Sequence, residues 1–367
     1  MFGMKRLVVV VLLFLSDSCF GFEIESYYPP LEDQRFLLDA SVSYFDSSLD
    51  ILGYADKIGG RSKPESASIQ SLVFSFQPAS NLWFTYHYED TSAEVIRSAE
   101  PFSLETTLVG HGLQVSAKLS NWLGFELWGT LGYAQRSQDE LVIECYDYAG
   151  VVLGGSCNNT DFQLINGDAL LETGETITYP VFTTNAEEDR WLVQLQAFRD
   201  ISDELRFRQS LTLLVSDISI SYESRLFDIE SSFILDANYG GRTLRSTLGS
   251  LRANLPQAKP WLSSSLKYGI GADYVIFDRW RASADLSYSY TTRVDYEVAA
   301  GVPDYRHNVK FSGSLQYAAN EWLILYVQGD VFSNYLLGED PLTYNASTAR
   351  FFEHPYGQLS LGAVVTF

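Results

Sequence analysis

Apolar and polar residues alternate along many segments of this chain, a period of two residues that is typical of β-strands with one face against an apolar medium. The final segment shows the pattern clearly. One of its faces carries Leu359, Leu361, Ala363, Val365 and Phe367. The other face carries Ser360, Gly362, Val364 and Thr366. Because the same alternation recurs through most of the chain, it predicts an all-β protein.

Short polar turns join the alternating segments in pairs, and longer polar connections separate the pairs. The turns are expected at 78–81, 120–121, 199–204, 277–279 and 318–321. The strands are expected at 36–46, 66–77, 82–91, 109–119, 122–135, 189–198, 204–216, 262–275, 280–292, 307–317, 322–334 and 356–367. This even count predicts an antiparallel up-and-down β-barrel of 12 strands. Residues 218–222 and 233–237 could form an extra hairpin and give 14 strands, but we favour extensions of the neighbouring strands.

Six of the seven tryptophans stand at the ends of these inferred strands. They are Trp83, Trp122, Trp191, Trp261, Trp280 and Trp322, and Trp128 alone is in mid-strand. Indole rings prefer the boundary between hydrocarbon and water. Their positions therefore predict two aromatic girdles around a transmembrane barrel.

Composition narrows the classes of function. No segment beyond residue 21 approaches the run of about 18 apolar residues that a membrane-spanning helix needs. A formal net charge of −21 argues against a nucleic acid partner and against polybasic attachment to anionic lipid. No cofactor or metal site is predicted.

Residues 1–21 have the order of a secretory signal peptide. Lys5 and Arg6 precede a short apolar run, and small residues lead up to Gly21, after which we expect cleavage. Export would leave two cysteines, Cys145 and Cys157, in a glycine-rich connection. A disulfide is the expected state of such a pair outside the cytoplasm.

The leader, the order of short turns and long connections, and a terminal strand ending on Phe367 resemble bacterial outer-membrane β-barrels. In that superfamily the barrel assembly machinery recognises the terminal strand. The resemblance implies this role for Leu359, Leu361, Ala363, Val365 and Phe367. It also implies one integral outer-membrane domain over 36–367, in contact with lipid and lipopolysaccharide, with periplasmic termini. Residues 22–35 would be a periplasmic segment long enough to enter the lumen.

Alternation assigns a set of charged strand residues to the lumen. They are Asp39, His87, Glu89, Lys118, Glu126, Arg206, Arg208, Lys267, Asp273, Arg281, Asp285, Lys310 and Asp330. Positive and negative charges are balanced in this set. That balance is consistent with a polar pathway for a hydrophilic solute and equally with a salt-bridged interior that fills a narrow barrel, and both interpretations stay open. The acidic excess is expected in the connection between Gln135 and Asp189. It comprises Asp139, Glu140, Glu144, Asp147, Asp161, Asp168, Glu172, Glu175, Glu187 and Glu188.

Catalysis is not predicted. Outer-membrane phospholipases and lipid A deacylases carry His-x-Ser on a strand, and none of the four histidines has this spacing. His87 with Glu89 is the only pair similar to omptin-type proteases. The leading prediction is a channel or binding protein for a small hydrophilic solute. The alternative is a closed structural or surface-interaction barrel, similar in strand count to an autotransporter translocator domain, and an outer-membrane hydrolase is the least favoured.

Overall fold

The computed structural model describes the strands of the chain and part of their connections. The described residues are 36–45, 62–97, 103–143, 145–148, 151–154, 165–166, 169–170, 182–223, 235–236, 238–239, 242–243, 245–246, 260–296, 306–333 and 356–366. The chain divides into two compact units. The first comprises Met1–Ser137, Glu187–Ile218 and Trp261–Phe367, and the second comprises Gln138–Ala186 and Ser219–Pro260.

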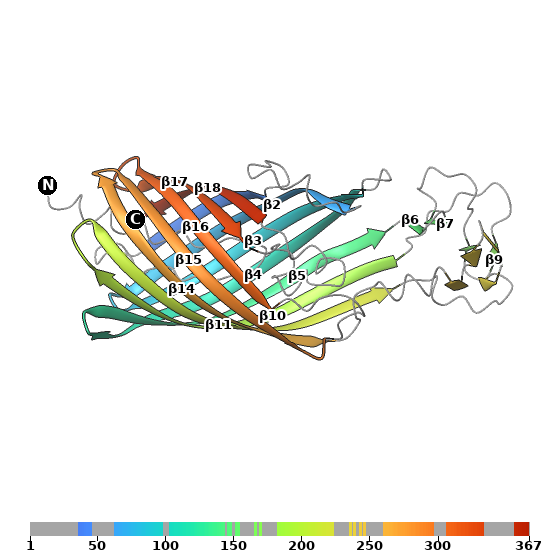
Figure 1. Ribbon diagram of the computed structural model, residues 1–367, viewed down its shortest axis with the longest axis horizontal. Helices are drawn as coiled ribbons and strands as arrows, with labels where there is room; N and C mark the ends of the chain where they lie inside the picture. Colours follow the sequence, from blue (N-terminus) through green and yellow to red (C-terminus); the bar gives the residue numbers. More distant parts are fainter. Residues whose placement is uncertain are drawn as a thin grey trace. The chain divides into compact units, whose positions relative to one another are not determined.

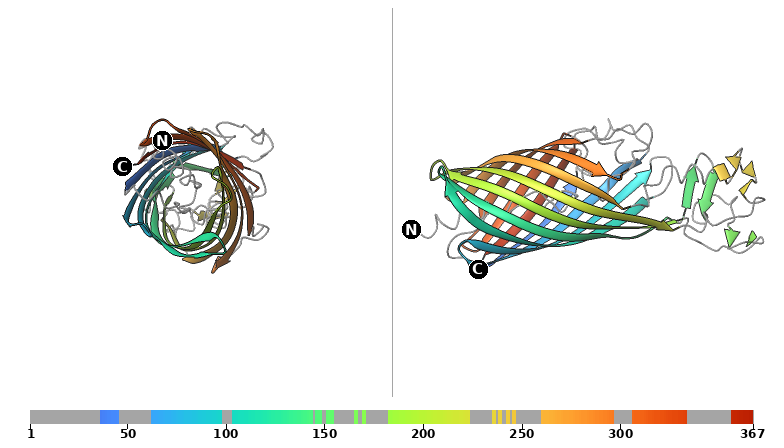
Figure 2. Two further views of the ribbon diagram at one scale, coloured as in Figure 1. Left: turned by 90° about the vertical axis from the view of Figure 1, so that its left-hand side faces the viewer. Right: turned by 90° about the horizontal axis from the view of Figure 1, so that it is seen from below.

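Twelve strands form a closed barrel (Figure 1). In chain order they are β1 (Phe36–Phe45), β2 (Ser62–Ala79), β3 (Leu82–Arg97), β4 (Ser103–Trp122), β5 (Phe125–Ile143), β10 (Phe182–Asp200), β11 (Leu205–Glu223), β14 (Trp261–Phe277), β15 (Trp280–Val294), β16 (His307–Ala318), β17 (Leu323–Phe332) and β18 (Tyr356–Thr366). β1 pairs antiparallel with both β2 and β18, which closes the ring seen end-on in Figure 2. Closure gives each of these strands a paired neighbour on both sides, so the sheet has no free edge strand.

The structure confirms the prediction of 12 strands over the alternative of 14. Residues 218–222 continue β11 and do not form a separate strand. The short strands β12 (Asn238–Tyr239) and β13 (Arg242–Thr243) pair with each other in a separate two-stranded sheet. The segment between β11 and β14 therefore adds no barrel strand among its described residues.

The described part of the second unit contains the ends of β5, β10 and β11 together with small two-stranded sheets. They are β6 (Cys145–Tyr148) with β7 (Val151–Gly154), β8 (Ile165–Asn166) with β9 (Ala169–Leu170), and β12 with β13. Arg245 Nε donates to Asp236 Oδ1 at 2.8 Å, and this hydrogen bond lowers the pKa of the Asp236 carboxyl. Within the described ranges, the structure has no helix of the length and apolarity required to cross a bilayer.

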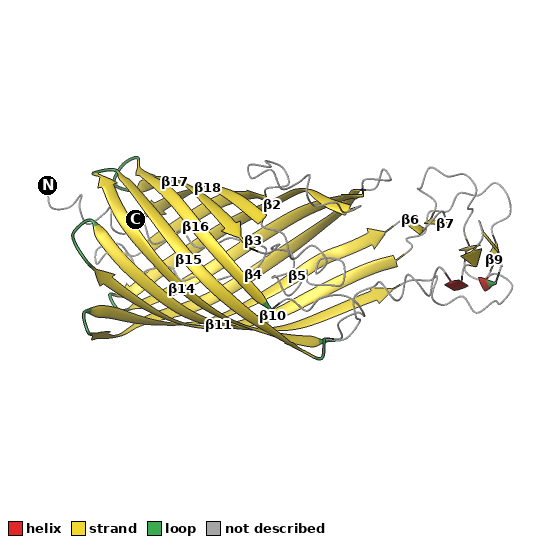
Figure 3. Ribbon diagram, in the orientation of Figure 1, coloured by secondary structure: helices red, strands yellow, loops and turns green. Residues whose placement is uncertain are grey.

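Five short turns lie at one end of the barrel, where Figure 3 draws them in green. They occupy 80–81, 123–124, 201–204, 278–279 and 319–322. The turn predicted at 120–121 is placed about three residues too early, because β4 continues to Trp122 and the chain reverses at Leu123 and Gly124. These two residues have φ of 50° and 80°, and glycine meets such a φ without steric cost.

One face of the strands carries large apolar side chains that are exposed. Leu286 of β15 is opposite Phe311 of β16, and the two residues are 46% and 52% exposed. Similar residues on other strands include Leu113, Leu131, Leu195, Tyr274 and Leu361. These residues form an apolar outer face around the barrel. The residues that alternate with them along each strand point to the interior.

The tryptophan prediction is only partly right. Trp191 and Trp280 are exposed on the outer face, as a girdle requires. Trp122 and Trp322 are also exposed, but Trp122 ends β4 instead of opening a strand, and Trp322 lies in the turn before β17. Trp83 and Trp261 are buried on the interior face. Side chains at every second position of a strand point to the same face. Trp83 therefore shares the interior face with His87 and Glu89, and Trp261 shares it with Lys267.

Candidate functional site

The interior face of the barrel holds the residues that sequence alternation assigned to a lumen. Eight of them are at most 6% exposed: Asp39, His87, Glu89, Lys267, Asp273, Arg281, Lys310 and Asp330. The side chains of Lys118, Glu126 and Asp285 are each 32% exposed, and those of Arg206 and Arg208 are 15% and 14% exposed. All alternate along their strands with residues of the apolar outer face.

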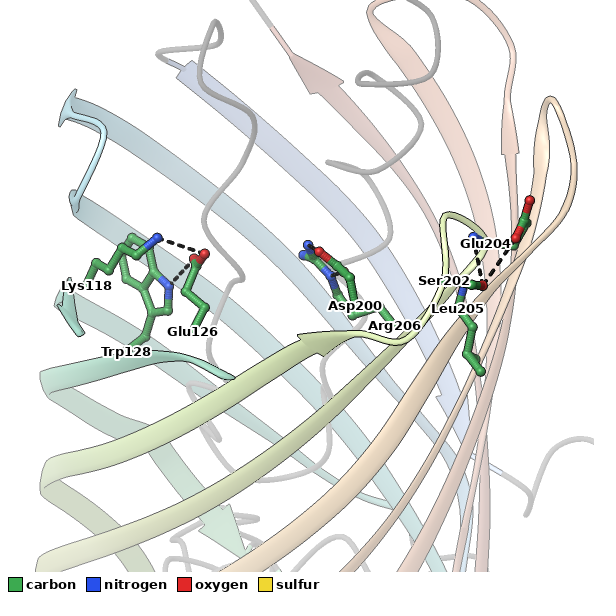
Figure 4. Close-up of polar contacts among 8 residues, drawn as sticks. All are labelled: Lys118, Glu126, Trp128, Asp200, Ser202, Glu204, Leu205 and Arg206. Atoms are coloured by element: carbon green, nitrogen blue, oxygen red, sulfur yellow. Dashed lines mark hydrogen bonds and ion pairs between the residues drawn. The ribbon is translucent and has the colours of Figure 1, made fainter. Parts of the chain in front are cut away.

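One ion pair lies next to the turn between β4 and β5. Lys118 Nζ is 2.8 Å from Glu126 Oε2, and Trp128 Nε1 donates to Glu126 Oε1 at 2.7 Å. Figure 4 shows Lys118 and Trp128 converging on this carboxylate. The Trp128 ring packs with Trp83 and Phe198 in a buried apolar cluster. The glutamate is therefore fixed by a charge on one side and an indole on the other.

A network of arginines and aspartates spans β11, β14 and β15 near their turns. Arg208 is paired with Asp285, and its Nη2 is also 3.5 Å from Asp273 Oδ1. Gly271 makes room for this pair, because a Cβ at that position would overlap the Asp285 carboxylate. Arg206 is paired with Asp200 next to the 201–204 turn (Figure 4). Arg206 and Arg281 also act electrostatically on Asp273.

The same turn is held by Ser202, whose hydroxyl accepts hydrogen bonds from the backbone N–H groups of Glu204 and Leu205 (Figure 4). A serine hydroxyl that caps its own turn in this way stabilises a tight chain reversal. The reversal places Asp200 and Arg206 side by side on adjacent strands. Local turn chemistry thus positions one ion pair of the network.

A second charged cluster was missed by the sequence reading. Arg136 Nη1 of β5 is 2.9 Å from Glu188 Oε2 of β10, and Arg190 Nη2 is 2.8 Å from Glu188 Oε1. The three residues are at most 2% exposed, and Arg190 Nε also donates to Ser216 Oγ at 3.3 Å. The prediction that Glu188 belongs to an acidic external connection is wrong, because β10 begins at Phe182 and carries it into the interior.

The remaining predicted residues have partners of several kinds. Ser71 Oγ is 2.8 Å from His87 Nε2, Thr91 Oγ1 donates to Glu89 Oε1 at 3.2 Å, and Tyr326 Oη donates to Asp39 Oδ1 at 3.0 Å. Lys310 Nζ is 3.9 Å from Asp330 Oδ1. Gln328 Nε2 also donates to both oxygens of Asp330. His87 and Glu89 are thus each bonded to a hydroxyl.

Hydroxyl pairs join neighbouring strands across the interior face. They are Ser43 with Ser360, Ser75 with Thr85, Ser116 with Thr130, Ser283 with Ser314, and Ser265 with Thr291. Among the described residues, clusters of apolar side chains interrupt this polar surface. The buried clusters are Trp83–Trp128–Phe198, Ala134–Leu192–Leu214 and Leu37–Ile324–Val364. The interior is therefore mixed, with charges and hydroxyls predominating.

Some sequence predictions fall outside the residues whose positions can be described. Cys157 and Phe367 lie there, and so does the side chain of Cys145, so the disulfide and the terminal aromatic stay predictions. The same holds for the leader and for residues 22–35. Among the described residues, no group of three or more His, Cys, Asp or Glu side chains could hold a metal ion.

No protein-family model matches this chain, and no curated protein matches it by sequence. Solved structures of barrels do match it. The translocator domain of autotransporter NalP from Neisseria meningitidis is 6% identical with a TM-score of 0.49, and the match covers 91% of this chain and 89% of that chain. The β domain of the Bordetella autotransporter BrkA is 8% identical with a TM-score of 0.48, and the match covers 91% of this chain and 100% of that chain. The NanC porin is 9% identical with a TM-score of 0.43, and the match covers 90% of this chain and 100% of that chain.

Proposed function

We propose that this protein is an integral outer-membrane barrel that passes or binds a small hydrophilic solute through its interior. The observation that supports the proposal most strongly is the opposition of the two faces of one closed sheet. The outer face exposes side chains such as Leu113, Leu131 and Phe311, each more than half exposed. The inner face carries the ion pairs and hydroxyl pairs described above.

The outer face supports a membrane environment on energetic grounds. A contiguous belt of exposed leucine, valine and aromatic side chains is unfavourable in water. Hydrocarbon removes this cost, and a closed barrel is one of two architectures whose backbone is satisfied inside it. Outer-membrane lipid and lipopolysaccharide are thus the proposed surroundings. Recognition by the barrel assembly machinery and export through the 1–21 leader complete this part of the proposal.

The inner face supports a polar solute. Arg136, Glu188 and Arg190 would be costly to bury without partners, and they are satisfied by one another. The arrangement of fixed donors and acceptors along the wall is suited to replacing the hydration shell of a hydrophilic molecule. We propose a binding or transport role and not an enzymatic one.

A second candidate is a closed barrel with a structural or surface-interaction role. It is favoured by the interior apolar clusters near the turns, which include Trp83, Trp128 and Phe198 on one group of strands and Leu37, Ile324 and Val364 on another. Apolar constrictions can exclude water and ions from a pore. The two candidates therefore differ in what they expect of ion flow.

Single-channel recording in planar bilayers distinguishes the two candidates. Purified full-length protein, inserted at a low ratio of protein to lipid, should give discrete conductance steps if the interior is a pathway. A barrel refolded without Trp83 and Trp128 side chains (Trp83→Ala with Trp128→Ala) should conduct more than the wild type. Absence of steps in both proteins, with heat-modifiable mobility intact, would favour the closed barrel.

A further inference from the structure

Three interior side chains on neighbouring strands form one row near the turns. Arg281 of β15 is opposite Gln316 of β16, and Gln316 is opposite Tyr326 of β17. Neighbouring strands lie about 4.8 Å apart, so the row is roughly 10 Å wide. This length is comparable to that of a small solute, and we refer to these three residues as the β15–β17 row.

Gln316 is the member of the row that lacks hydrogen bonds. The residue is 3% exposed, and neither Oε1 nor Nε2 has a hydrogen-bond partner. A buried amide without partners is unfavourable, and native interiors rarely contain one. Its group is both a donor and an acceptor, so a molecule that satisfies it must accept one hydrogen bond and donate another. Hydroxyl groups do both.

Tyr326 supplies an aromatic ring next to that amide. The ring is held against Gly362 of β18, where a Cβ would overlap it. Its hydroxyl donates to Asp39 of β1 at 3.0 Å, which fixes the ring from the far side. The apolar face of an aromatic ring is a surface on which the C–H groups of a cyclic polyol can pack.

Charge balance in this region favours an uncharged ligand. Arg281 belongs to the network in which Arg206 and Arg208 are paired with Asp200, Asp273 and Asp285. Three guanidinium groups face three carboxylates, so this network itself carries no net charge. Asp273 is 1% exposed, and its two oxygens accept no hydrogen bond. It is therefore a second acceptor for a hydroxyl donor.

We propose that the β15–β17 row, together with Asp273 of β14, is a binding subsite for an uncharged polyhydroxylated solute such as a neutral oligosaccharide. The proposal rests on the proposed function, because the solute must enter the interior to reach it. Gln316 and Asp273 select hydroxyl groups, and Tyr326 packs against the ring that bears them. A solute with a net charge gains no compensating ion there.

Binding by the refolded full-length protein in detergent tests the subsite directly. Isothermal titration calorimetry would compare maltotriose, cellotriose and triacetylchitotriose, all uncharged, with trigalacturonate as a charged probe of similar size. Gln316→Leu and Tyr326→Leu should each weaken binding of a neutral probe by about tenfold. Gln194→Leu is the matched control, because Gln194 of β10 is 2% exposed and its Nε2 already donates to Thr212 Oγ1 at 2.8 Å, so that only its Oε1 lacks a partner.

Urea unfolding supplies a second readout. Gln316→Leu removes an unsatisfied amide at similar volume, so its unfolding midpoint should equal or exceed that of the wild type. The neutral probe should raise the midpoint of the wild type more than that of this variant. Failure of all three neutral probes to bind, tighter binding of trigalacturonate, or equal losses in Gln194→Leu and Gln316→Leu would each overturn the subsite.

The subsite and the proposed function fail in different experiments. If the protein conducts but binds no neutral probe, the proposed solute pathway is supported and the proposed subsite is contradicted. Binding that depends on Gln316 in a barrel that does not conduct keeps the subsite and removes passage through the interior. Current recordings with the neutral probe, compared between the wild type and Gln316→Leu, connect the two results.

Discussion

At the scale of single residues, the side of the strand on which a side chain stands decides its surroundings. Leu286 is 46% exposed on the outer face of β15, and the next residue, Ser287, points to the interior. A step of one position thus moves a side chain from the proposed lipid phase to the polar wall. The two neighbours therefore make a matched pair for testing the membrane assignment.

We expect Leu286→Arg to destabilise the membrane-embedded barrel by about 2–4 kcal/mol, because it places a charge in hydrocarbon. Ser287→Arg should be tolerated, since its guanidinium would reach the polar interior. Urea unfolding of protein refolded into lipid vesicles, followed by heat-modifiable mobility, measures both. Similar losses in the two variants would contradict the assignment of the outer face.

Glu188 illustrates the opposite case, a charge that the interior requires. It lies between Arg136 and Arg190, and all three are almost fully buried. Glu188→Gln would leave two guanidinium groups without a counter-ion, a loss of about 3–5 kcal/mol. The same unfolding assay measures it. Asp236→Asn is the control, because Asp236 forms an exposed pair with Arg245 and its loss should leave the unfolding midpoint unchanged.

At the scale of strands, close approach between neighbours depends on where glycine occurs. In β14, a Cβ at position 271 would overlap the Asp285 carboxylate and lie 2.9 Å from Arg208 Nε. Glycine therefore allows an ion pair to cross over one strand and join its two neighbours. In β17, a Cβ at position 329 would meet nothing within 4 Å.

Gly271→Ala should therefore displace the Arg208–Asp285 pair and destabilise the barrel by about 1–3 kcal/mol. Gly329→Ala makes the same chemical change in an open position and should be neutral or slightly stabilising. Comparing the urea midpoints of the two variants isolates the close approach. A neutral Gly271→Ala would mean that the ion pair contributes nothing to holding β11, β14 and β15 together.

The strands show how far the sequence pattern reaches. Alternation predicts 280–292 and 307–317, and the structure has β15 at Trp280–Val294 and β16 at His307–Ala318. It predicts 189–198 where β10 covers Phe182–Asp200. The difference arises because apolar alternation marks only the part of a strand that faces the apolar medium, whereas backbone pairing continues beyond it.

Alternation along a strand predicts which residues face the interior, but it does not predict which residues they contact there. Asp39, Glu89 and Lys267 are on the interior face by counting along the strand. Their partners are not visible in the sequence, because they depend on the register between strands, as in the pairing of Tyr326 with Asp39. Glu188 differs for another reason: the sequence predicts a strand only from residue 189, whereas β10 begins at Phe182 and its alternation places Ala186, Glu188 and Arg190 on the interior face.

At the scale of the whole molecule, the barrel depends on contact between the two ends of its sheet. β1 and β18 pair from Leu37 with Thr366 to Phe45 with Gln358. Within this seam Ser43 Oγ lies 2.8 Å from Ser360 Oγ, and both residues are buried. Because these strands are separated by most of the chain, the seam forms only when the ring closes, and its long-range pairing is expected to be slow.

A disulfide across the seam would report closure directly. In a background with Cys145→Ser and Cys157→Ser, the pair Ser43→Cys and Ser360→Cys should oxidise spontaneously in the folded barrel. Opposite residues of an antiparallel pair have Cα atoms about 4.5–5.5 Å apart, within the range that a disulfide spans. Non-reducing electrophoresis of the membrane-inserted protein detects the link. Ser43→Cys with Ser289→Cys of β15 should not oxidise, because three strands separate β1 from β15 in the ring. Equal oxidation of both pairs, or of neither, would contradict a closed ring with this strand order.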